Sequence, residues 1–161
     1  MTIKRTGFIA LATAIVMVVS YLQFINSLST PKEEIVEKHL SNDNGTLVQV
    51  AEYLSSSKQT NFRLVDNSGY DASTNRKIVS ESSFLKKVEF LFDEHEYKEI
   101  RKEANTVRFV RWTRVGGFEA GLCYVPDGSP KIEYLTIYKA LSMRGWYYYE
   151  ADYNQWRVDN Y

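Results

Sequence analysis

The sequence predicts an α+β fold in which one helix packs on a curved antiparallel sheet of about five strands, behind an N-terminal transmembrane helix and a helical stalk. Three observations predict it. Residues 84–92 place apolar side chains at helical spacing, and the chain after Tyr97 alternates with a period of two. In addition, residues 6–30 contain no charged side chain. A stretch of that length and composition can cross a bilayer.

The N-terminal segment has the dimensions of a membrane span. As a helix, residues 7–25 would extend roughly 28 Å, close to the roughly 30 Å hydrocarbon core of a bilayer. Lys4 and Arg5 precede the segment, which favours a cytoplasmic N-terminus over residues 1–5. We therefore expect residues 6–29 to form a transmembrane helix or uncleaved signal anchor at the cell membrane, with the rest of the chain outside the cytoplasm.

A cleaved secretory signal is the alternative. Ser27 and Ser29 are small residues at the spacing that signal peptidase reads, just past an apolar core. Cleavage there would make the protein secreted. The anchor is favoured because apolar character continues from Phe8 to Ile25, whereas the core of a signal peptide usually has about 7 to 15 residues.

A helical stalk is expected over residues 30–58. Pro31 suits the first position of a helix, and two glutamates follow it near the positive end of the helix dipole. Residues 41–45 are rich in asparagine, aspartate and glycine and should end this helix. A second helix is expected over residues 46–56, because four apolar residues share one face: Leu47, Val50, Ala51 and Leu54.

Residues 59–161 are expected to form one extracytoplasmic α+β domain. Residues 61–65 predict a short strand, and the polar stretch 66–76 predicts a loop. Ser80 or Ser82 can cap the clearest helix of the chain. Its apolar stripe is about three turns long and consists of Phe84, Leu85, Val88, Leu91 and Phe92.

The strands after this helix are expected to form a meander. They are predicted over residues 98–102, 106–114, 118–125, 132–138 and 146–150. Turn residues separate the first strands, with Gly116 and Gly117 at one reversal and a Pro-Asp-Gly sequence at residues 126–128. A helix followed by such strands suggests a cystatin-like roll or a similar architecture, which by itself implies no activity.

The composition excludes some classes of function. The chain has 20 Lys and Arg residues against 20 Asp and Glu, so no net field favours nucleic acid or an anionic membrane surface. Several basic residues lie within residues 101–114, where adjacent strands would gather them into a modest cationic patch or a solvated strand face. The single cysteine, Cys123, is expected to be a small buried hydrophobe.

Metal and cofactor chemistry has little basis in the sequence. His95 lies among Asp93, Glu94 and Glu96. This grouping could recruit a divalent cation but is more typical of a solvated helix end. The other histidine, His39, falls in the expected stalk, and two histidines cannot make a three-histidine zinc site. No nucleophile elbow, P-loop or dinucleotide-binding motif is present. We expect no metal and no cofactor, and an enzyme is the less favoured class.

The aromatic C-terminal stretch holds the strongest binding candidates. On an extended strand four residues would share one face, and a further tryptophan follows them: Trp146, Tyr148, Glu150, Asp152 and Trp156. Aromatic rings beside carboxylates suit a sugar, since rings stack on C–H faces while acids accept hydrogen bonds from hydroxyls. Packing in a core is the alternative interpretation, because large aromatics are favoured strand residues.

These patterns favour a non-enzymatic module that binds an envelope protein or a glycan. Two other classes stay open. Glu150 and Asp152 could serve as the carboxylate pair of a small cell-wall glycan hydrolase. The domain could also be an inhibitor or immunity-like protein that occupies a partner's site.

Short stretches of the C-terminal part resemble small membrane-anchored or secreted extracytoplasmic proteins of Gram-positive bacteria. The stretches are residues 97–100 (YKEI), the turn at Asn105, and residues 107–109 (VRF), 121–124 (GLCY) and 145–150 (GWYYYE). Those proteins have no assigned activity. The resemblance therefore implies an extracytoplasmic location and a fold, and it transfers no functional residue.

Overall fold

The computed structural model describes residues 15–17, 31–43, 45–58, 61–65, 68–71, 77–78 and 82–160. The chain divides into two units, Met1–Thr30 and Pro31–Tyr161. Of the predicted transmembrane helix only residues 15–17 are described, and these are helical. The rest of that prediction lies outside the described residues. Within the described residues, no helix is long and apolar enough to cross a bilayer.

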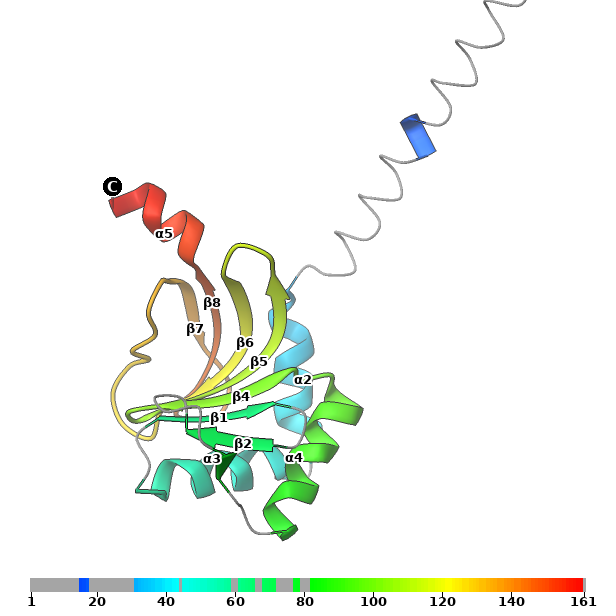
Figure 1. The fold of residues 1–161 in the computed structure, drawn as a ribbon, viewed down its shortest axis with the longest axis vertical. Helices are drawn as coiled ribbons and strands as arrows, with labels where there is room; N and C mark the ends of the chain where they lie inside the picture. The colour runs from blue at the N-terminus through cyan, green and yellow to red at the C-terminus, as the bar shows by residue number, and fades with distance from the viewer. Residues whose placement is uncertain are drawn as a thin grey trace, which may run out of the picture. The chain divides into compact units, whose positions relative to one another are not determined.

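An antiparallel sheet forms the centre of the second unit (Figure 1). Its strands, in the part of the chain that is described, are β1 (Asn61–Val65), β2 (Ser68–Asp71), β3 (Lys77–Ile78), β4 (Glu99–Glu103), β5 (Thr106–Arg114), β6 (Phe118–Tyr124), β7 (Leu135–Ala140) and β8 (Trp146–Asp152). Their order across the sheet is β3-β2-β1-β4-β5-β6-β8-β7. The α+β class and the antiparallel sheet are therefore confirmed.

The sheet is larger than the predicted five strands, and its last part is not a simple meander. β2 forms inside the stretch predicted as a loop, because pairing with β1 outweighs the turn-forming composition of that stretch. β1 in turn pairs with β4 and extends the sheet on that side. At the other side β6 pairs with β8 instead of β7, so β7 lies at the edge.

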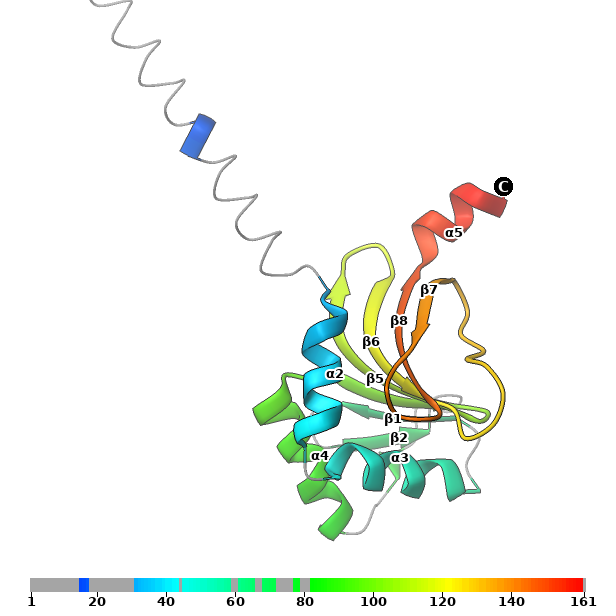
Figure 2. The same ribbon diagram turned by 180° about the vertical axis from the view of Figure 1, so that it is seen from behind.

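Three helices pack against the sheet, where the sequence predicted one. They are α2 (Glu33–Asn42), α3 (Thr46–Ser56) and α4 (Ser82–His95). Two opposite views show them beside the sheet, and their buried side chains join one core with those of the strands (Figures 1 and 2). A fourth helix of this unit in the described part of the chain, α5 (Tyr153–Asn160), continues directly from β8 and was not predicted.

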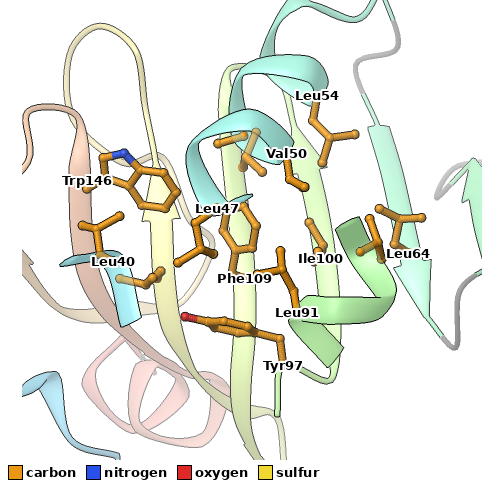
Figure 3. Close-up of a cluster of buried hydrophobic side chains, with 14 of the residues drawn as sticks. Leu40, Leu47, Val50, Leu54, Leu64, Leu91, Tyr97, Ile100, Phe109 and Trp146 are labelled. Atoms are coloured by element: carbon orange, nitrogen blue, oxygen red, sulfur yellow. The ribbon is translucent and has the colours of Figure 1, made fainter. Parts of the chain in front are cut away.

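The core lies between the sheet and these three helices. Figure 3 shows side chains from α2, α3, α4 and the central strands meeting there. Aromatic rings fill its middle: the ring centroids of Phe109 and Trp146 are 5.6 Å apart, and those of Tyr97 and Phe109 are 5.9 Å apart. The apolar stripe predicted for the helix at residues 82–95 is confirmed, since its buried residues are Phe84, Val88 and Leu91.

The helices predicted as a stalk belong to the folded unit. α3 begins and ends at the predicted residues, and all four apolar residues of its predicted face are buried. α2 buries Val36 and Leu40 in the same core. An apolar stripe at helical spacing needs a partner surface, and the sheet provides it. The stalk prediction for residues 30–58 was wrong in this respect.

The other face of the sheet is covered in part by the chain between β6 and β7. Ile132 packs there in a small apolar cluster with Cys123, Tyr149 and Ala151. Cys123 is a buried free cysteine, as predicted, and burial raises the pKa of its thiol to about 12. A thiol with that pKa is a poor nucleophile at neutral pH.

Candidate functional site

Two of the five residues predicted for binding lie in the core. Trp146 is 2% exposed, and its ring centroid lies 5.2 Å from that of Tyr124. Tyr148 is buried in the same cluster. β8 lies between β6 and β7, and the helices cover the face that these two residues share. Both side chains therefore serve packing, which was the alternative interpretation of the aromatic stretch.

The two predicted carboxylates make local hydrogen bonds. Glu150 accepts one from the hydroxyl of Tyr148, and burial together with this bond raises the pKa of Tyr148. One oxygen of Asp152 accepts from the backbone amides of Asn154 and Gln155, at 2.9 and 3.1 Å. Asp152 thus caps the N-terminus of α5.

Trp156 lies in an aromatic pocket that α5 forms with the segment before β7. The ring centroid of Tyr134 is 5.0 Å from that of Trp156 and 4.8 Å from that of Tyr153. The Tyr153 and Trp156 rings are nearly parallel, with centroids 6.2 Å apart. The open pocket has a volume of about 660 Å³. We call it the aromatic pocket; its lining residues are Tyr134, Tyr153, Trp156, Arg157 and Val158.

Backbone hydrogen bonds hold the two sides of this pocket together. The amide of Asp152 donates to the carbonyl of Tyr134 at 2.9 Å, and the amide of Tyr153 donates to the carbonyl of Gly117 at 3.4 Å. Tyr134 has a positive φ of 61°, which is uncommon for a residue other than glycine and persists only where surrounding contacts enforce it. The pocket is therefore built into the end of the sheet.

Sequence reasoning found Trp156 but missed Tyr134 and Tyr153. It placed Tyr153 on the continuation of a strand, and Tyr134 within one. Asp152 could have indicated the helix α5 that carries Tyr153, since an aspartate just before a polar stretch is a common helix N-cap. A helix beginning at Tyr153 would have turned that ring and the Trp156 ring toward the same side.

The pocket offers chemistry for binding. Three ring faces can stack on the apolar C–H face of a sugar or on another apolar group. Tyrosine hydroxyls and the guanidinium of Arg157 can supply hydrogen bonds at the rim. Among the described residues that line the pocket, none has a carboxylate, imidazole or thiol that could act as a general base near neutral pH.

A second polar cluster brings together the only two histidines of the chain. The ring centroids of His39 on α2 and His95 on α4 are 4.4 Å apart. Nε2 of His95 lies 3.0 Å from one oxygen of Asp43, whose other oxygen accepts from the amide of Leu47 at 2.6 Å. His95 is the last residue of α4, and its ring packs against His39 of α2 while the neighbouring acidic residues are exposed. Among the described residues, no group of three or more ligand-type side chains could hold a metal ion.

Folding should become less favourable at mildly acidic pH because of His39. Burial first, and then the charges of His95, Arg111 and Lys38, lower the pKa of His39 to about 4. Its unfolded value is 6.5, so the stability that neutral His39 contributes is complete above pH 6.5 and is lost as the pH falls toward 4.

Urea midpoints of the protein and of His39→Gln, measured from pH 7.5 to 4, test this. As the pH falls, the urea midpoint of the wild type should fall more than that of His39→Gln. Parallel curves would contradict the prediction.

Two of the basic residues predicted to form a cationic patch, Arg101 and Arg108, are instead part of an ion-pair network on the sheet face away from the helices. Nε of Arg63 lies 2.6 Å from Glu99, and Nη1 of Arg101 lies 3.1 Å from Glu119. Arg101 also pairs with Glu99, and Arg108 pairs with Glu119 and Glu103. Three arginines and three glutamates alternate, so the network carries no net charge. It offers no surplus cation for an anionic partner.

Comparison of the chain with protein-family models, with curated proteins and with solved structures gives no match. The aromatic pocket and the N-terminal segment are thus the features from which a function can be argued. The resemblance to extracytoplasmic proteins stays a prediction.

Proposed function

We propose that the protein is a single-pass membrane-anchored module whose folded unit lies outside the cytoplasm and binds a cell-envelope glycan. The uncharged segment at residues 6–30, with Lys4 and Arg5 before it, supports the anchor and its orientation. The resemblance to extracytoplasmic proteins of Gram-positive bacteria points the same way. The folded unit then follows as a binding domain on the outer side.

The aromatic pocket is the observation that carries the binding proposal. Its three rings come from two segments that backbone hydrogen bonds fix relative to one another. Binding sites for sugars combine such ring faces with a few polar groups, and a preformed site avoids much of the entropic cost of ordering side chains. Arg157 provides a charged donor at the rim. A glycan uses both kinds of group.

Trp156→Ala should weaken binding of soluble cell-wall glycan fragments at least about tenfold, which corresponds to about 1.4 kcal/mol. The reason is the loss of the largest ring of the pocket. Titration calorimetry on the full chain in detergent gives the affinity. Phe90→Ala is the matched control, since Phe90 is an exposed aromatic on α4, outside the pocket. Equal affinities for the wild type and Trp156→Ala would refute the assignment of the pocket.

The alternatives make different predictions with the same material. In a hydrolase that uses Glu150 and Asp152, the fragments would gain new reducing ends, and Glu150→Gln would abolish that turnover. If the protein is an inhibitor or immunity-like protein, a pull-down with it from solubilised membranes would instead recover one enzyme in stoichiometric amount. Glu150 accepts from a buried hydroxyl and Asp152 caps a helix, so these contacts give the hydrolase alternative no specific support.

A further inference from the structure

We infer that the glycan bound by the aromatic pocket carries an anionic group, a carboxylate or a phosphate, and that Arg157 selects for this group. The inference rests on the proposed function and names the chemical class of the ligand. The anion lies against the guanidinium of Arg157 while a neighbouring sugar ring stacks on Tyr134, Tyr153 or Trp156. All four residues belong to the folded unit, Pro31–Tyr161.

The aromatic pocket has one charged side chain among the described residues that line it, and that side chain is a cation. Arg157 is accompanied there by three aromatic rings and by Val158. A cation in such a lining makes the local potential positive, although the whole chain has no net charge. An anionic group therefore complements the pocket, whereas a neutral group leaves the charge unused and a cationic group is repelled.

The guanidinium of Arg157 is available for a ligand. It makes no ion pair or hydrogen bond with the described part of the chain. It is exposed, and α5 extends past the end of β8 in both views (Figures 1 and 2). Arginines of the sheet differ, since each has a glutamate partner. These pairs are Arg63–Glu99, Arg101–Glu99, Arg108–Glu119 and Arg111–Glu96.

The carboxylates nearest to Arg157 on α5 have partners of their own. Asp152 caps the helix through two backbone amides. Asp159 accepts a hydrogen bond from Nε2 of Gln155 at 2.9 Å. Gln155 and Asp159 are each two residues from Arg157, which places them on nearly the opposite side of the helix. Neither carboxylate lines the pocket, so neither occupies the place of an anionic ligand.

A guanidinium beside a ring face suits an acidic sugar. The planar N–H donors of arginine match two oxygens of a carboxylate or a phosphate, and the group stays charged at neutral pH. Arg157 lies in the last turn of α5, four residues after Tyr153, so the donors and the Tyr153 ring share one side of the helix. A sugar with an acidic substituent presents an apolar ring face and an anion next to each other.

Cell-wall glycan fragments separated by anion-exchange chromatography into a neutral and an anionic pool test the inference. Titration calorimetry on the full chain in detergent gives the affinity for each pool. The wild type should bind the anionic pool about fivefold more tightly, the size expected for one exposed ion pair. Arg157→Gln should bring this ratio close to one. Lys131→Gln removes an exposed cation outside the pocket and should leave the ratio unchanged.

Chemical treatment of the anionic pool distinguishes the two sources of negative charge. Reduction of the carboxylates to alcohols removes the first source. Cleavage of phosphate esters with hydrofluoric acid removes the second. One treatment, or the two together, should abolish the tighter binding, and a preference that survives both would overturn the inference.

The outcomes distinguish the ligand class from the proposed function. Equal or reversed affinities of the wild type for the two pools would overturn the anionic ligand, and weakening of both by Trp156→Ala would show that the pocket still binds glycan. A ratio that is unchanged in Arg157→Gln, or that falls equally in Lys131→Gln, would overturn the role of Arg157. If the wild type binds neither pool, the proposed function fails and this inference fails with it.

Discussion

Replacing Trp146 by alanine should lower the free energy of unfolding by about 4 kcal/mol, the middle of the range for large aromatic truncations in a core. Trp146 is almost completely buried between the sheet and the helices. Its ring contacts those of Phe109 and Tyr124. Alanine would remove these contacts and leave a cavity that the surrounding strands cannot close.

Urea denaturation followed by far-ultraviolet circular dichroism measures this loss. Trp156→Ala is the matched control, because it removes the same side chain from a partly exposed position on α5. Its cost should stay below about 1 kcal/mol. If the two variants lost equal stability, the assignment of Trp146 to the core and of Trp156 to the surface would be wrong.

Local sequence patterns were sufficient to predict the elements that bury a single face against the core. The stripe Leu47, Val50, Ala51 and Leu54 fixes the period of α3, and the same holds for α4. The β4–β5 hairpin was predicted from alternation and from the turn at Ala104 and Asn105. In these cases intrinsic propensity and burial agree, and such agreement makes a prediction from one sequence reliable.

The wrong predictions have a common physical cause: contacts between residues far apart in the sequence determine the structure of these segments. β2 has the composition of a loop and forms a strand only because β1 lies beside it. α2 carries few apolar residues, and only its contacts with the sheet show that it belongs to the folded unit. Nothing in residues 33–42 alone distinguishes a helix that packs on a sheet from a helix in a stalk.

The candidate site shows the same limit. Alternation along β8 correctly separates Trp146 and Tyr148 from Tyr149 and Ala151, but it does not tell which face is covered. Both faces are covered. The helices bury Trp146 and Tyr148, and the segment that contains Ile132 buries Tyr149 and Ala151. The accessible aromatics come instead from α5 and from the segment before β7, which the sheet order brings together.

Glu119→Met should lower the free energy of unfolding by about 3 kcal/mol, because it leaves a buried arginine without its main partner. The side chain of Arg108 is only 6% exposed and pairs with Glu119 and Glu103. The carboxylate of Glu119 also pairs with Arg101 and accepts from the hydroxyl of Tyr149 at 3.3 Å. Glu103 is 43% exposed and cannot compensate fully for the loss.

The double variant Glu119→Met/Arg108→Met should recover much of this loss, since apolar residues can replace a buried ion pair at little cost. It also removes Nε of Arg108, which is buried and has no hydrogen-bond partner among the described residues. Glu103→Met is the control and should cost less than about 1 kcal/mol. Urea unfolding of the wild type, Glu119→Met, Arg108→Met and the double variant at low and high salt gives the coupling energy, and Glu103→Met is measured beside them. A double variant that loses the sum of the single-variant effects would show that Arg108 and Glu119 are not coupled, and that the network contributes through packing alone.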